Sequence, residues 1–449
     1  MTDRNKSYLV VGLGVSGMSV VRYLARVGAA FEVLENSVEK LQNLMKKEAL
    51  LKDIKCHTSA LNLELLSRFD YVVVSPGMSV RTDMFKAALK AGVEVIGDVE
   101  LFAREVDKPV FAVTGSNGKS TVVSMAGELL KASGIKTAVV GNVGAACLDS
   151  LNDKSIDAYV LELSSFQLET TFSLQPHVSS VLNISADHLD RYDDIEDYAE
   201  VKRRIYNNAR HVVFNADDKL TRPANLPNYD SCMSFSSSAV ESDWSVKASG
   251  GAPVLSGESA EISATDVKVA GSHNYANALA AMAMISIFVN ADKASMSRFF
   301  TEGFSNFTGL PHRTRLVCEA GCVSWINDSK GTNVGATVSA ITGMSSPVVL
   351  IAGGRGKNSD YQPLREAVAK FCTAVVLIGE DADNIAESLA DVVPVYRETS
   401  MADAVRRSAA ISRPGDCVLL SPACSSFDMF KNFEERGAVF ESEVKKLCA

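Results

Sequence analysis

The chain has 449 residues, of which 47% are hydrophobic and 22% are charged. These fractions are typical of a globular protein and exclude a mostly disordered or collagen-like chain. Lys and Arg total 45 against 54 Asp and Glu, which gives a net charge of −9. A general nucleic-acid binder usually has the opposite excess, so an anionic ligand would need a local basic site.

The length suggests two to four domains at about 100–200 residues each. No apolar run reaches the roughly 18 residues of a membrane span, and the longest, residues 278–289, is interpreted as a buried helix. The polar start of the chain has no signal-peptide pattern. The nine cysteines are scattered without a C-x-x-C pair, and Cys318 and Cys322 lack zinc-type partners, so we expect free thiols and a cytoplasmic location.

The first hundred residues alternate between two patterns. Apolar runs at residues 8–11, 31–34 and 71–74 predict strands, and residues 16–27 have the apolar spacing of a helix. Such alternation predicts a parallel sheet with crossover helices.

A glycine-rich turn follows the first strand, with Gly12, Gly14 and Gly17 in the pattern G-x-G-x-x-G, and Glu35 closes the next strand. A tight turn, close backbone approach to a diphosphate and a helix N-terminus are the parts of a dinucleotide site. The motif leaves two ligands open: NAD or FAD, or another diphosphate compound. The run Ser75-Pro-Gly77 ends a further strand, where a ligand could also lie, although an ordinary turn has the same composition.

A second α/β block opens with an apolar strand at residues 109–113, followed by the run Thr114-Gly-Ser-Asn-Gly-Lys-Ser-Thr121. Strand, glycine loop and helix form a phosphate-binding loop: backbone N–H groups surround phosphate, Lys119 reaches the terminal phosphates and the Ser120 hydroxyl binds Mg²⁺. The common pattern has glycine where this chain has Val113, so the loop is a variant.

Three ionisable residues follow the phosphate-binding loop. Glu162 ends a predicted strand at residues 159–163 and could ligate Mg²⁺ beside the loop, since hard cations prefer oxygen ligands. His188 follows the next predicted strand, residues 179–184. A lone histidine is more often structural, but strand ends that meet beside a phosphate loop favour a catalytic role. Lys202 lies on a predicted helix, and by itself would belong to a solvated face.

The last part of the chain divides into an irregular stretch and a third α/β block. Residues 223–264, rich in Ser, Gly, Pro and Asn, predict small irregular β structure, and residues 274–289 predict a buried helix. The third block begins near Leu310. Its apolar strands are typical of a parallel sheet and are expected at residues 348–351, 374–378 and 417–420.

The run Pro311-His-Arg313 opens the third block. Further polar runs follow its strands: Asp328-Ser-Lys-Gly-Thr-Asn333 after a short strand, then Gly353-Gly-Arg-Gly-Lys357 and Ser421-Pro-Ala-Cys-Ser-Ser-Phe-Asp428. Together they place Lys, Arg, Thr and Ser at the strand ends of one sheet, which is how an anionic small ligand would be held. A nucleophilic role for Cys424 is disfavoured because no paired histidine is evident and buried cysteines are usually inert.

The order and spacing of these motifs resemble the ATP-dependent Mur ligase family over nearly the whole chain. The resemblance rests on Thr114-Gly-Ser-Asn-Gly-Lys-Ser-Thr121, Glu162, Asp187-His188, His273-Asn274, Pro311-His-Arg313 and Asp328-Ser-Lys-Gly-Thr-Asn333. It implies an α/β fold of three domains. These are a Rossmann-like N-terminal domain at residues 1–97 that binds a UDP-substrate, a central P-loop ATPase-like domain at residues 98–309, and a Rossmann-like C-terminal domain at residues 310–449 that binds an amino acid.

The resemblance also implies roles for individual residues. For ATP they are Gly115, Ser116, Asn117, Gly118, Lys119, Ser120, Thr121, Asn274, Arg313, Asp328 and Lys330. For the UDP-substrate they are Val15, Ser16, Ser75, Gly77 and Asn142. For the amino acid they are His188, Thr332, Lys357, Ser426, Phe427 and Phe433. The implied catalytic residues are Lys119, Glu162, His188 and Lys202, and the implied Mg²⁺ ligands are Ser120, Glu162, His188 and Lys202 after its carbamylation by CO₂.

The glycine-rich turn at the start and the run Ser421–Asp428 with Phe433 are similar to the family branch that joins D-glutamate to UDP-N-acetylmuramoyl-L-alanine in peptidoglycan precursor synthesis. That likeness implies an ADP-forming ligase with an acyl-phosphate intermediate, two Mg²⁺ ions, no nucleic-acid or membrane partner, and a monomeric state. Phe427 stands where the family pattern has Leu, Ser425 where Ala is common, and Asn36-Ser37 lacks an expected Arg near the uracil.

Three alternatives remain open on the sequence. A folylpolyglutamate synthase-like ligase would share the central domain but would not need the glycine-rich opening or the Ser-Pro-Ala-Cys run. A nicotinamide-dependent dehydrogenase would explain the opening and leave the phosphate-binding loop without a role. A non-catalytic nucleotide sensor would leave Glu162, His188 and Lys202 unexplained.

Overall fold

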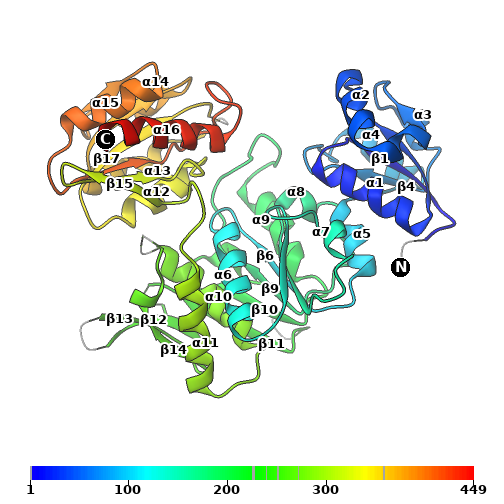
Figure 1. Cartoon of the computed structure of the whole chain (residues 1–449), viewed down its shortest axis with the longest axis horizontal. Helices are drawn as coiled ribbons and strands as arrows, with labels where there is room; N and C mark the ends of the chain where they lie inside the picture. The colour runs from blue at the N-terminus through cyan, green and yellow to red at the C-terminus, as the bar shows by residue number, and fades with distance from the viewer. Residues whose placement is uncertain are drawn as a thin grey trace.

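The computed structural model describes residues 3–448 except 225–227, 239, 250–251, 270, 272 and 357–358. The side chains of residues 249 and 448 are also not described. It contains three β-sheets, each of which follows the previous one along the chain. Figure 1 shows three lobes, with the first and the third standing on either side of the central one. The predicted α/β fold is confirmed.

The first sheet has five parallel strands in the order β3-β2-β1-β4-β5. Its strands are β1 (Ser7–Val11), β2 (Ala30–Leu34), β3 (Cys56–His57), β4 (Tyr71–Val74) and β5 (Glu94–Ile96). Its helices are α1 (Val15–Val27), α2 (Val38–Lys47), α3 (Leu63–Leu66) and α4 (Asp83–Lys90), with a 3-10 turn η1 (Ala49–Asp53). Because the order reverses at β1, the ends of β1, β2 and β4 form the crevice in which such sheets bind ligands.

The central sheet has nine strands in the order β14-β13-β12-β11-β10-β9-β6-β8-β7. Its strands are β6 (Val110–Thr114), β7 (Thr137–Gly141), β8 (Ala158–Glu162), β9 (Val178–Val181), β10 (His211–Asn215), β11 (Ser231–Ser236), β12 (Trp244–Ser249), β13 (Ala252–Ser256) and β14 (Glu261–Ser263). The last four come from the stretch expected to be small and irregular. They instead continue the large sheet, because β11 pairs with β10 in parallel and β12, β13 and β14 then pair in succession.

Helices cover both faces of the central sheet. They are α5 (Asp98–Glu105), α6 (Lys119–Ala132), α7 (Cys147–Ser150), α8 (Ser165–Leu168), α9 (Ile195–Arg203), α10 (His273–Ser286) and α11 (Lys293–Asn306). Short 3-10 turns are η2 (Arg204–Tyr206), η3 (Lys219–Thr221) and η5 (Ala264–Asp266). Helix α10 is buried along most of its length, as expected for its run of Ala and Met.

The third sheet has six strands in the order β15-β16-β20-β17-β18-β19, of which only the β15–β16 pair is antiparallel. Its strands are β15 (Arg315–Ala320), β16 (Val323–Asn327), β17 (Val348–Gly353), β18 (Cys372–Ile378), β19 (Val395–Arg397) and β20 (Cys417–Leu420). Its helices are α12 (Val334–Thr342), α13 (Gln362–Phe371), α14 (Ala382–Ser388), α15 (Met401–Ile411) and α16 (Phe433–Cys448).

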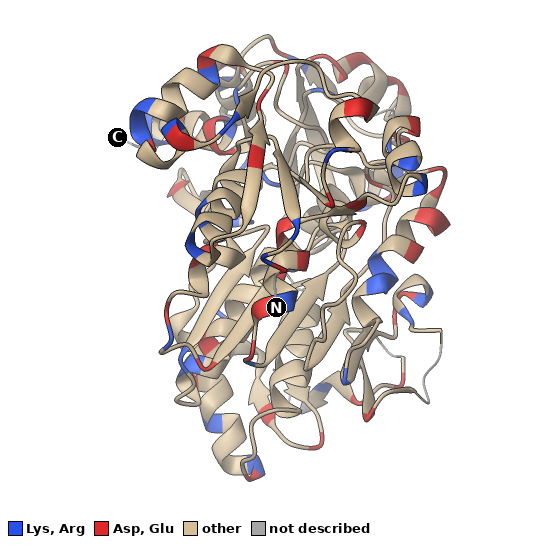
Figure 2. Ribbon diagram, turned by 90° about the vertical axis from the view of Figure 1, so that its right-hand side faces the viewer, with Lys and Arg blue, Asp and Glu red and all other residues tan. Residues whose placement is uncertain are grey.

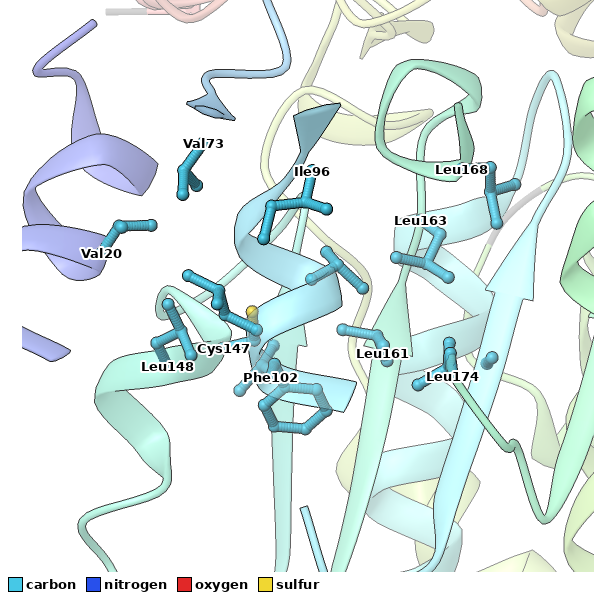
Figure 3. Close-up of a cluster of buried hydrophobic side chains, with 14 of the residues drawn as sticks. Val20, Val73, Ile96, Phe102, Cys147, Leu148, Leu161, Leu163, Leu168 and Leu174 are labelled. Atoms are coloured by element: carbon cyan, nitrogen blue, oxygen red, sulfur yellow. The ribbon is translucent and has the colours of Figure 1, made fainter. Parts of the chain in front are cut away.

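The first two lobes share one hydrophobic cluster, whereas the third lobe has clusters of its own. Figure 3 shows the shared cluster, in which Val20 and Val73 of the first lobe lie near Phe102 of α5 and Leu148 of α7. Helix α5 connects the two sheets and packs against both α1 and α7. The first two lobes are therefore joined by apolar packing as well as by the chain.

Charges of both signs are mixed over the helices in Figure 2, and the strands carry few of them. Within the described parts of the chain, none of the helices combines the length and apolar character that a membrane crossing requires. The expectation of free thiols holds for seven cysteines: Cys56, Cys147, Cys232, Cys322, Cys372, Cys417 and Cys424. It is wrong for Cys318, which is disulfide-bonded.

Candidate active site

The phosphate-binding loop lies at the end of β6, between the ends of two neighbouring strands. Strand β6 pairs with β8, which ends at Glu162, and with β9, which leads to Asn183 and then His188. Helix α6 begins directly after the loop, with its N-cap at Gly118. The N-terminus of α6 and the predicted side chains of two adjacent strands are therefore brought to one edge of the sheet, as parallel strands require.

The shape of the loop depends on glycine at position 118. Gly118 has a φ of +81°, in the left-handed region, and a Cβ built there would lie 2.4 Å from Oδ1 of Asn277 on α10. Any other residue would be strained and would displace Asn277. This explains the position of the second loop glycine in the sequence motif.

Polar contacts fix the remainder of the loop. The Ser116 hydroxyl donates to the carbonyl of Ser185 (3.0 Å) and accepts from its N–H (2.9 Å). The Asn117 N–H donates to Oδ1 of Asn183 (2.8 Å), and Nδ2 of Asn183 donates to the Asn117 carbonyl (3.1 Å). Asn183 was not among the predicted site residues. The sequence analysis included it in the strand predicted at residues 179–184, but β9 ends at Val181, so Asn183 lies in the loop beyond the strand end.

Lys119 and Lys202 both point at the carbonyls of the loop. The Lys119 ammonium donates to the carbonyls of Gly115 (2.8 Å) and Ser116 (2.9 Å), and Lys202 donates to the same Gly115 carbonyl (2.8 Å). Lys202 is only 1% exposed. Burial, and then repulsion from Lys119, hold the pKa of Lys202 well below its usual value. The charge pattern alone suggested that Lys202 belongs to a solvated face. The structure shows that this is wrong, because the side chain is buried.

Glu162 presents one oriented and one unpartnered oxygen. Its Oε1 accepts from Nδ2 of Asn142 (2.7 Å), and the Asn142 N–H donates to the Glu162 carbonyl (3.0 Å). Its Oε2 is buried and has no hydrogen-bond partner within the described residues. A buried carboxylate oxygen without a partner is unfavourable unless a cation binds there. The donor set Glu162 and Ser120 thus fits a hard cation such as Mg²⁺.

His188 lies in a strained turn beside an aromatic ring. Its backbone has a φ of +56°, which non-glycine residues adopt infrequently. Its imidazole meets the ring of Phe166 edge-on, with centroids 4.8 Å apart, and its Nε2 lies 3.6 Å from Oδ2 of Asp187. No group of three or more His, Cys, Asp or Glu side chains that could hold a metal occurs in the described part of the chain. Metal ligands beyond Glu162 and His188 would therefore come from hydroxyls, lysine or the substrates.

A cavity of about 440 Å³ lies between the central and the third lobe, next to the phosphate-binding loop. Seven of the predicted ATP residues line it: Asn117, Gly118, Thr121, Asn274, Arg313, Asp328 and Lys330. His273 also lines it, and burial lowers the pKa of this side chain to about 4, so the imidazole is neutral near pH 7. Arg313 of the third lobe donates to the Ser120 hydroxyl of the loop (2.7 Å).

Two groups contributed by the third lobe have unusual ionisation. Burial raises the pKa of Asp328 to about 6, although the Ser421 hydroxyl and the Thr314 N–H donate to its carboxyl (2.7 and 3.1 Å). Burial, together with repulsion from Arg313 and Lys119, lowers the pKa of Lys330 to about 8. The Lys330 ammonium lies 3.8 Å from the centre of the Phe433 ring.

The predicted amino-acid residues lie on the third lobe. Ser426 is buried, Phe427 is 65% exposed, and Phe433 begins α16. Thr332 stands just before the N-cap of α12. Lys357 lies outside the described residues. Of this set, only His188 belongs to the central lobe.

A buried arginine that was not predicted holds the loops of the third lobe together. Arg436 on α16 is 1% exposed and donates to the carbonyls of Ser329 (2.8 Å), Cys424 (3.0 Å) and Ser425 (3.2 Å). The Cys424 thiol lies 3.1 Å from the hydroxyl of Tyr361, and burial raises the pKa of the thiol to about 12. The thiol stays protonated near pH 7, which agrees with the expectation that it is not a nucleophile.

Four of the five predicted UDP-substrate residues lie at the start of α1 or on the loop after β4, whereas Asn142 follows β7 of the central lobe and is hydrogen-bonded to Glu162. Gly17 allows this turn, because a Cβ there would lie 1.9 Å from the carbonyl oxygen of Gly12. The Ser75 hydroxyl donates to the same carbonyl (3.0 Å), Val15 is 77% exposed and Ser16 lies in the first turn of α1. Gly77 is exposed on the neighbouring loop.

Glu35 is occupied by contacts within the protein. Its carboxylate accepts from the Leu13 N–H (3.0 Å) and pairs with Lys40 (2.6 Å). A nicotinamide dinucleotide would need this carboxylate for its ribose. The structure thus gives Glu35 a role in fixing the glycine-rich turn and weakens the dehydrogenase alternative.

Three family models match successive parts of the chain. They are the Mur ligase MurD-like N-terminal domain at residues 6–97, the Mur ligase middle domain at residues 113–285, and the Mur ligase glutamate ligase domain at residues 312–424. The match over the first lobe also separates this chain from the folylpolyglutamate synthase-like alternative, for which the glycine-rich opening is not needed.

Curated relatives and a solved structure match over almost the full length. A UDP-N-acetylmuramoylalanine–D-glutamate ligase of Legionella pneumophila is 43% identical, covering 98% of this chain and 99% of the relative. An enzyme of the same name from Pseudomonas aeruginosa is 44% identical, covering 98% of both chains. The solved pseudomurein peptide ligase type C of Methanothermus fervidus shares the fold, with a TM-score of 0.60, 17% identity and coverage of 99% of this chain and 100% of that chain.

Proposed function

The chain belongs to the Mur ligase family, and from this premise we propose that it is the ligase that joins D-glutamate to UDP-N-acetylmuramoyl-L-alanine, with ATP converted to ADP and phosphate. The observation that carries the proposal is the identity of 43–44% to enzymes of that name over 98% of the chain. The product is a precursor of peptidoglycan. We place the reaction in the cytoplasm, which supplies the ATP.

ATP binds in the cavity between the central and third lobes. The phosphates lie against the N–H groups of the loop and the N-terminus of α6, where backbone dipoles favour negative charge. Lys119 exchanges its contacts with the loop carbonyls for the terminal phosphates. Asp328 accepts from the ribose hydroxyls, and Asn274 and Arg313 hold the remainder of the nucleotide.

The chemistry proceeds in two steps. A carboxylate oxygen of the terminal L-alanine attacks the γ-phosphorus of ATP, so that an acyl phosphate forms and ADP leaves. The deprotonated amine of D-glutamate then attacks the acyl carbon, and phosphate leaves as the amide bond forms and the nitrogen releases a proton. The first step joins two anions and therefore requires positive charge at the reacting oxygens. Arg313 and Lys119 lie close enough to Lys330 to lower its pKa, and the three side chains together provide this positive charge.

The residues beside the loop fit Mg²⁺. Ser120 and the unpartnered oxygen of Glu162 would hold the cation, and the phosphate oxygens and water would complete its shell. When bound, Mg²⁺ neutralises phosphate charge and orients the terminal phosphate for in-line attack. Asn142 fixes the Glu162 carboxylate through Oε1 and leaves Oε2 without a hydrogen-bond partner among the described residues.

Lys202 is suited to carbamylation. A neutral amine, and not an ammonium, reacts with CO₂, and burial beside Lys119 lowers the pKa of Lys202 and so favours its neutral form. The carbamate would replace a buried base by an oxygen ligand next to Gly115 and Thr114, with which the amine now makes contact. The carbamate and His188 would then together hold a second Mg²⁺.

The other two substrates approach from the flanking lobes. The diphosphate of the UDP-substrate lies at the N-terminus of α1, near Val15, Ser16, Ser75 and Gly77. D-Glutamate lies at the strand ends of the third sheet, near Thr332, Ser426, Phe427 and Phe433. The central lobe between them brings the L-alanine carboxylate and the incoming amine to the γ-phosphate.

The experiment that tests this function measures phosphate release with ATP, Mg²⁺ and UDP-N-acetylmuramoyl-L-alanine while the amino acid is varied. D-Glutamate, L-glutamate, L-alanine, L-lysine and diaminopimelate are compared, and mass spectrometry identifies the product. We expect release only with D-glutamate, and none with the variant Lys119→Ala. Release with a different amino acid would overturn the substrate assignment, and no release with folded, ATP-binding protein would overturn the reaction.

A further inference from the structure

Arg191 lies between the catalytic centre and the UDP-substrate loop. It follows His188 by three residues, and its N–H donates to the His188 carbonyl (2.9 Å), which closes the turn that carries the imidazole. Its side chain is only 10% exposed and has contacts on three sides. Neither the sequence motifs nor the proposed reaction gives this residue a role.

The first set of contacts reaches the N-terminal lobe. The guanidinium Nη1 donates to the carbonyl of Pro76 (3.4 Å), and Nη2 donates to the carbonyl of Met78 (3.3 Å). These carbonyls flank Gly77, in the loop that follows β4 and carries Ser75. Both bonds are to the backbone, so they restrain the path of the loop whatever its side chains are.

The second contact reaches the catalytic histidine through an aromatic ring. The Arg191 guanidinium lies 3.8 Å from the centre of the Phe166 ring, and the His188 imidazole meets the same ring at 4.8 Å. Phe166 belongs to α8, which begins three residues after Glu162. One ring thus contacts both the guanidinium and the imidazole, and both contacts are favourable.

The third contact anchors the guanidinium. Oε2 of Glu169 accepts from Nη2 of Arg191, while Oε1 accepts from Nε of Arg81 (2.7 Å). Arg81, on the N-terminal lobe, also forms a two-pronged pair with Asp197 of α9 (2.5 and 2.9 Å). The Glu169 side chain is 4% exposed, so the carboxylate that pairs with Arg191 and Arg81 is shielded from solvent.

Nε of Arg191 is buried without a hydrogen-bond partner in the described part of the structure. An unpaired buried donor is unfavourable. The orientation of the guanidinium is therefore set by its other contacts and not by a hydrogen bond from Nε. The stacking on Phe166 and the two backbone carbonyls account for that orientation.

We propose that Arg191 is a positioning residue that fixes the UDP-substrate loop, residues 76–78, relative to the catalytic His188. This inference rests on the proposed function. The planar fork of arginine can stack on the ring and donate to two carbonyls at once, whereas lysine offers one compact charge and can do only one of these. The substitution Arg191→Lys therefore keeps the charge next to Glu169 and removes the positioning.

Steady-state kinetics with the full-length protein test the proposal. We expect Arg191→Lys to raise KM for UDP-N-acetylmuramoyl-L-alanine about ten-fold and to lower kcat, because misplacement by a fraction of an ångström weakens both binding and alignment. We expect KM for ATP to change less than about two-fold, since the ATP cavity is lined by none of these residues.

Arg22→Ala is the matched control. Arg22 also joins the first two lobes, through Asp149 of α7 (2.6 Å), but it has no hydrogen bond to the UDP-substrate loop within the described residues. Its substitution is expected to leave KM for the UDP-substrate within about two-fold of the unmodified chain. An equal rise in both variants would show that general cohesion of the lobes is responsible and would overturn the proposal.

A second readout is independent of turnover. The ring of Phe166 shifts the NMR signals of the His188 imidazole, so we expect Arg191→Lys to move the ¹³Cε1–¹H signal of His188 while the His57 signal stays. Unchanged His188 signals and an unchanged KM would overturn the inference. If Arg191→Lys does not fold, Phe166→Leu is measured in the same way with the same criteria. Product formation by the unmodified chain is recorded first, so that failure of the proposed function is recognised separately.

Discussion

Burial changes what individual ionisable side chains can do in this protein. Lys202 is a lysine without solvent, next to a second lysine, and its pKa is lowered as a result. Burying a lysine costs free energy of folding, so its presence here calls for a functional reason. The carbamate form proposed above supplies that reason, because Lys202 contacts the phosphate-binding loop.

We predict that Lys202→Ala is inactive and that a small added carboxylate such as formate or acetate partly restores activity, because the carboxylate replaces the missing oxygen ligand. Restoration is measured as phosphate release at increasing carboxylate concentration. Lys131→Ala, which removes an exposed lysine at the far end of α6, is expected to keep normal activity without added carboxylate. A ¹³C carbamate signal in ¹³CO₂-equilibrated buffer should be present in the unmodified chain and absent in Lys202→Ala, and its absence from both would contradict the assignment.

The buried carboxyl of Asp328 predicts a pH dependence of stability. Its pKa is raised from an ordinary value of 3.8 to about 6, so between these pH values the folded chain holds a proton that the unfolded chain has released. The free energy of unfolding therefore falls as pH rises through this window. We predict that Asp328→Asn, which has no charge to bury, gains on the order of 2 kcal/mol relative to the unmodified chain between pH 4 and pH 7.

Urea unfolding of both chains at several pH values measures this difference. Asp383→Asn, at an exposed carboxylate of the same lobe, should show no comparable pH-dependent gain. A difference between Asp328→Asn and the unmodified chain that is constant over pH 4–7 would contradict the prediction. The same substitution should weaken ATP binding if Asp328 contacts the ribose.

At the scale of the element, a helix holds two loops in the third lobe. Arg436 projects from α16 and donates to carbonyls that follow β16 and β20. These loops carry Ser426 and, a few residues after Ser329, Thr332. Because the donors of one guanidinium satisfy carbonyls in both loops, the shape of the proposed D-glutamate site depends on a residue outside it.

We predict that Arg436→Met lowers the free energy of unfolding by about 3 kcal/mol, since it leaves several buried carbonyls without donors, and raises KM for D-glutamate. Urea unfolding and steady-state kinetics measure the two effects. Arg406→Met on α15, whose side chain is 71% exposed, is expected to change the free energy of unfolding by less than about 0.5 kcal/mol. Equal losses in the two variants would rule out the special role of Arg436.

The elements themselves could mostly be predicted from the sequence. The apolar runs at residues 8–11, 71–74 and 417–420 are strands of parallel sheets, because such strands are covered on both faces and carry few polar residues. Strands β11–β14 could not be placed in advance. Their Ser-rich, half-buried sequences resemble loops, and only pairing with β10 across the sheet edge orders them.

At the scale of the whole molecule, the site is assembled from distant parts of the chain. Nδ2 of Asn333 donates to Oδ1 of Asn117 (3.2 Å) and to Oδ2 of Asp187 (3.1 Å), across the boundary between the central and third lobes. Motifs predicted the P-loop and the strand-end residues, because local spacing determines them. Sequence spacing does not determine a contact between residues 216 positions apart, nor the partners of Arg436 and Arg191.

We predict that Asn333→Ser loosens the third lobe. Serine keeps the N-cap of α12, which Asn333 now provides to the Ala336 N–H, but cannot reach both central-lobe partners. The expected results are a larger radius of gyration in ligand-free small-angle X-ray scattering and a higher KM for ATP. Asn62→Ser, at the N-cap of α3, should leave the scattering curve unchanged. A ligand-free curve for Asn333→Ser that matches the unmodified chain would contradict this prediction.

The division of the hydrophobic clusters has a calorimetric consequence. The first two lobes share one apolar cluster and should melt as a unit, whereas the third lobe has its own clusters and can melt separately. The ATP cavity is walled by the central and third lobes, so a nucleotide that needs both walls binds only while both are folded. A heat-capacity trace with two peaks should therefore become a trace with one, at a higher temperature, when nucleotide is added.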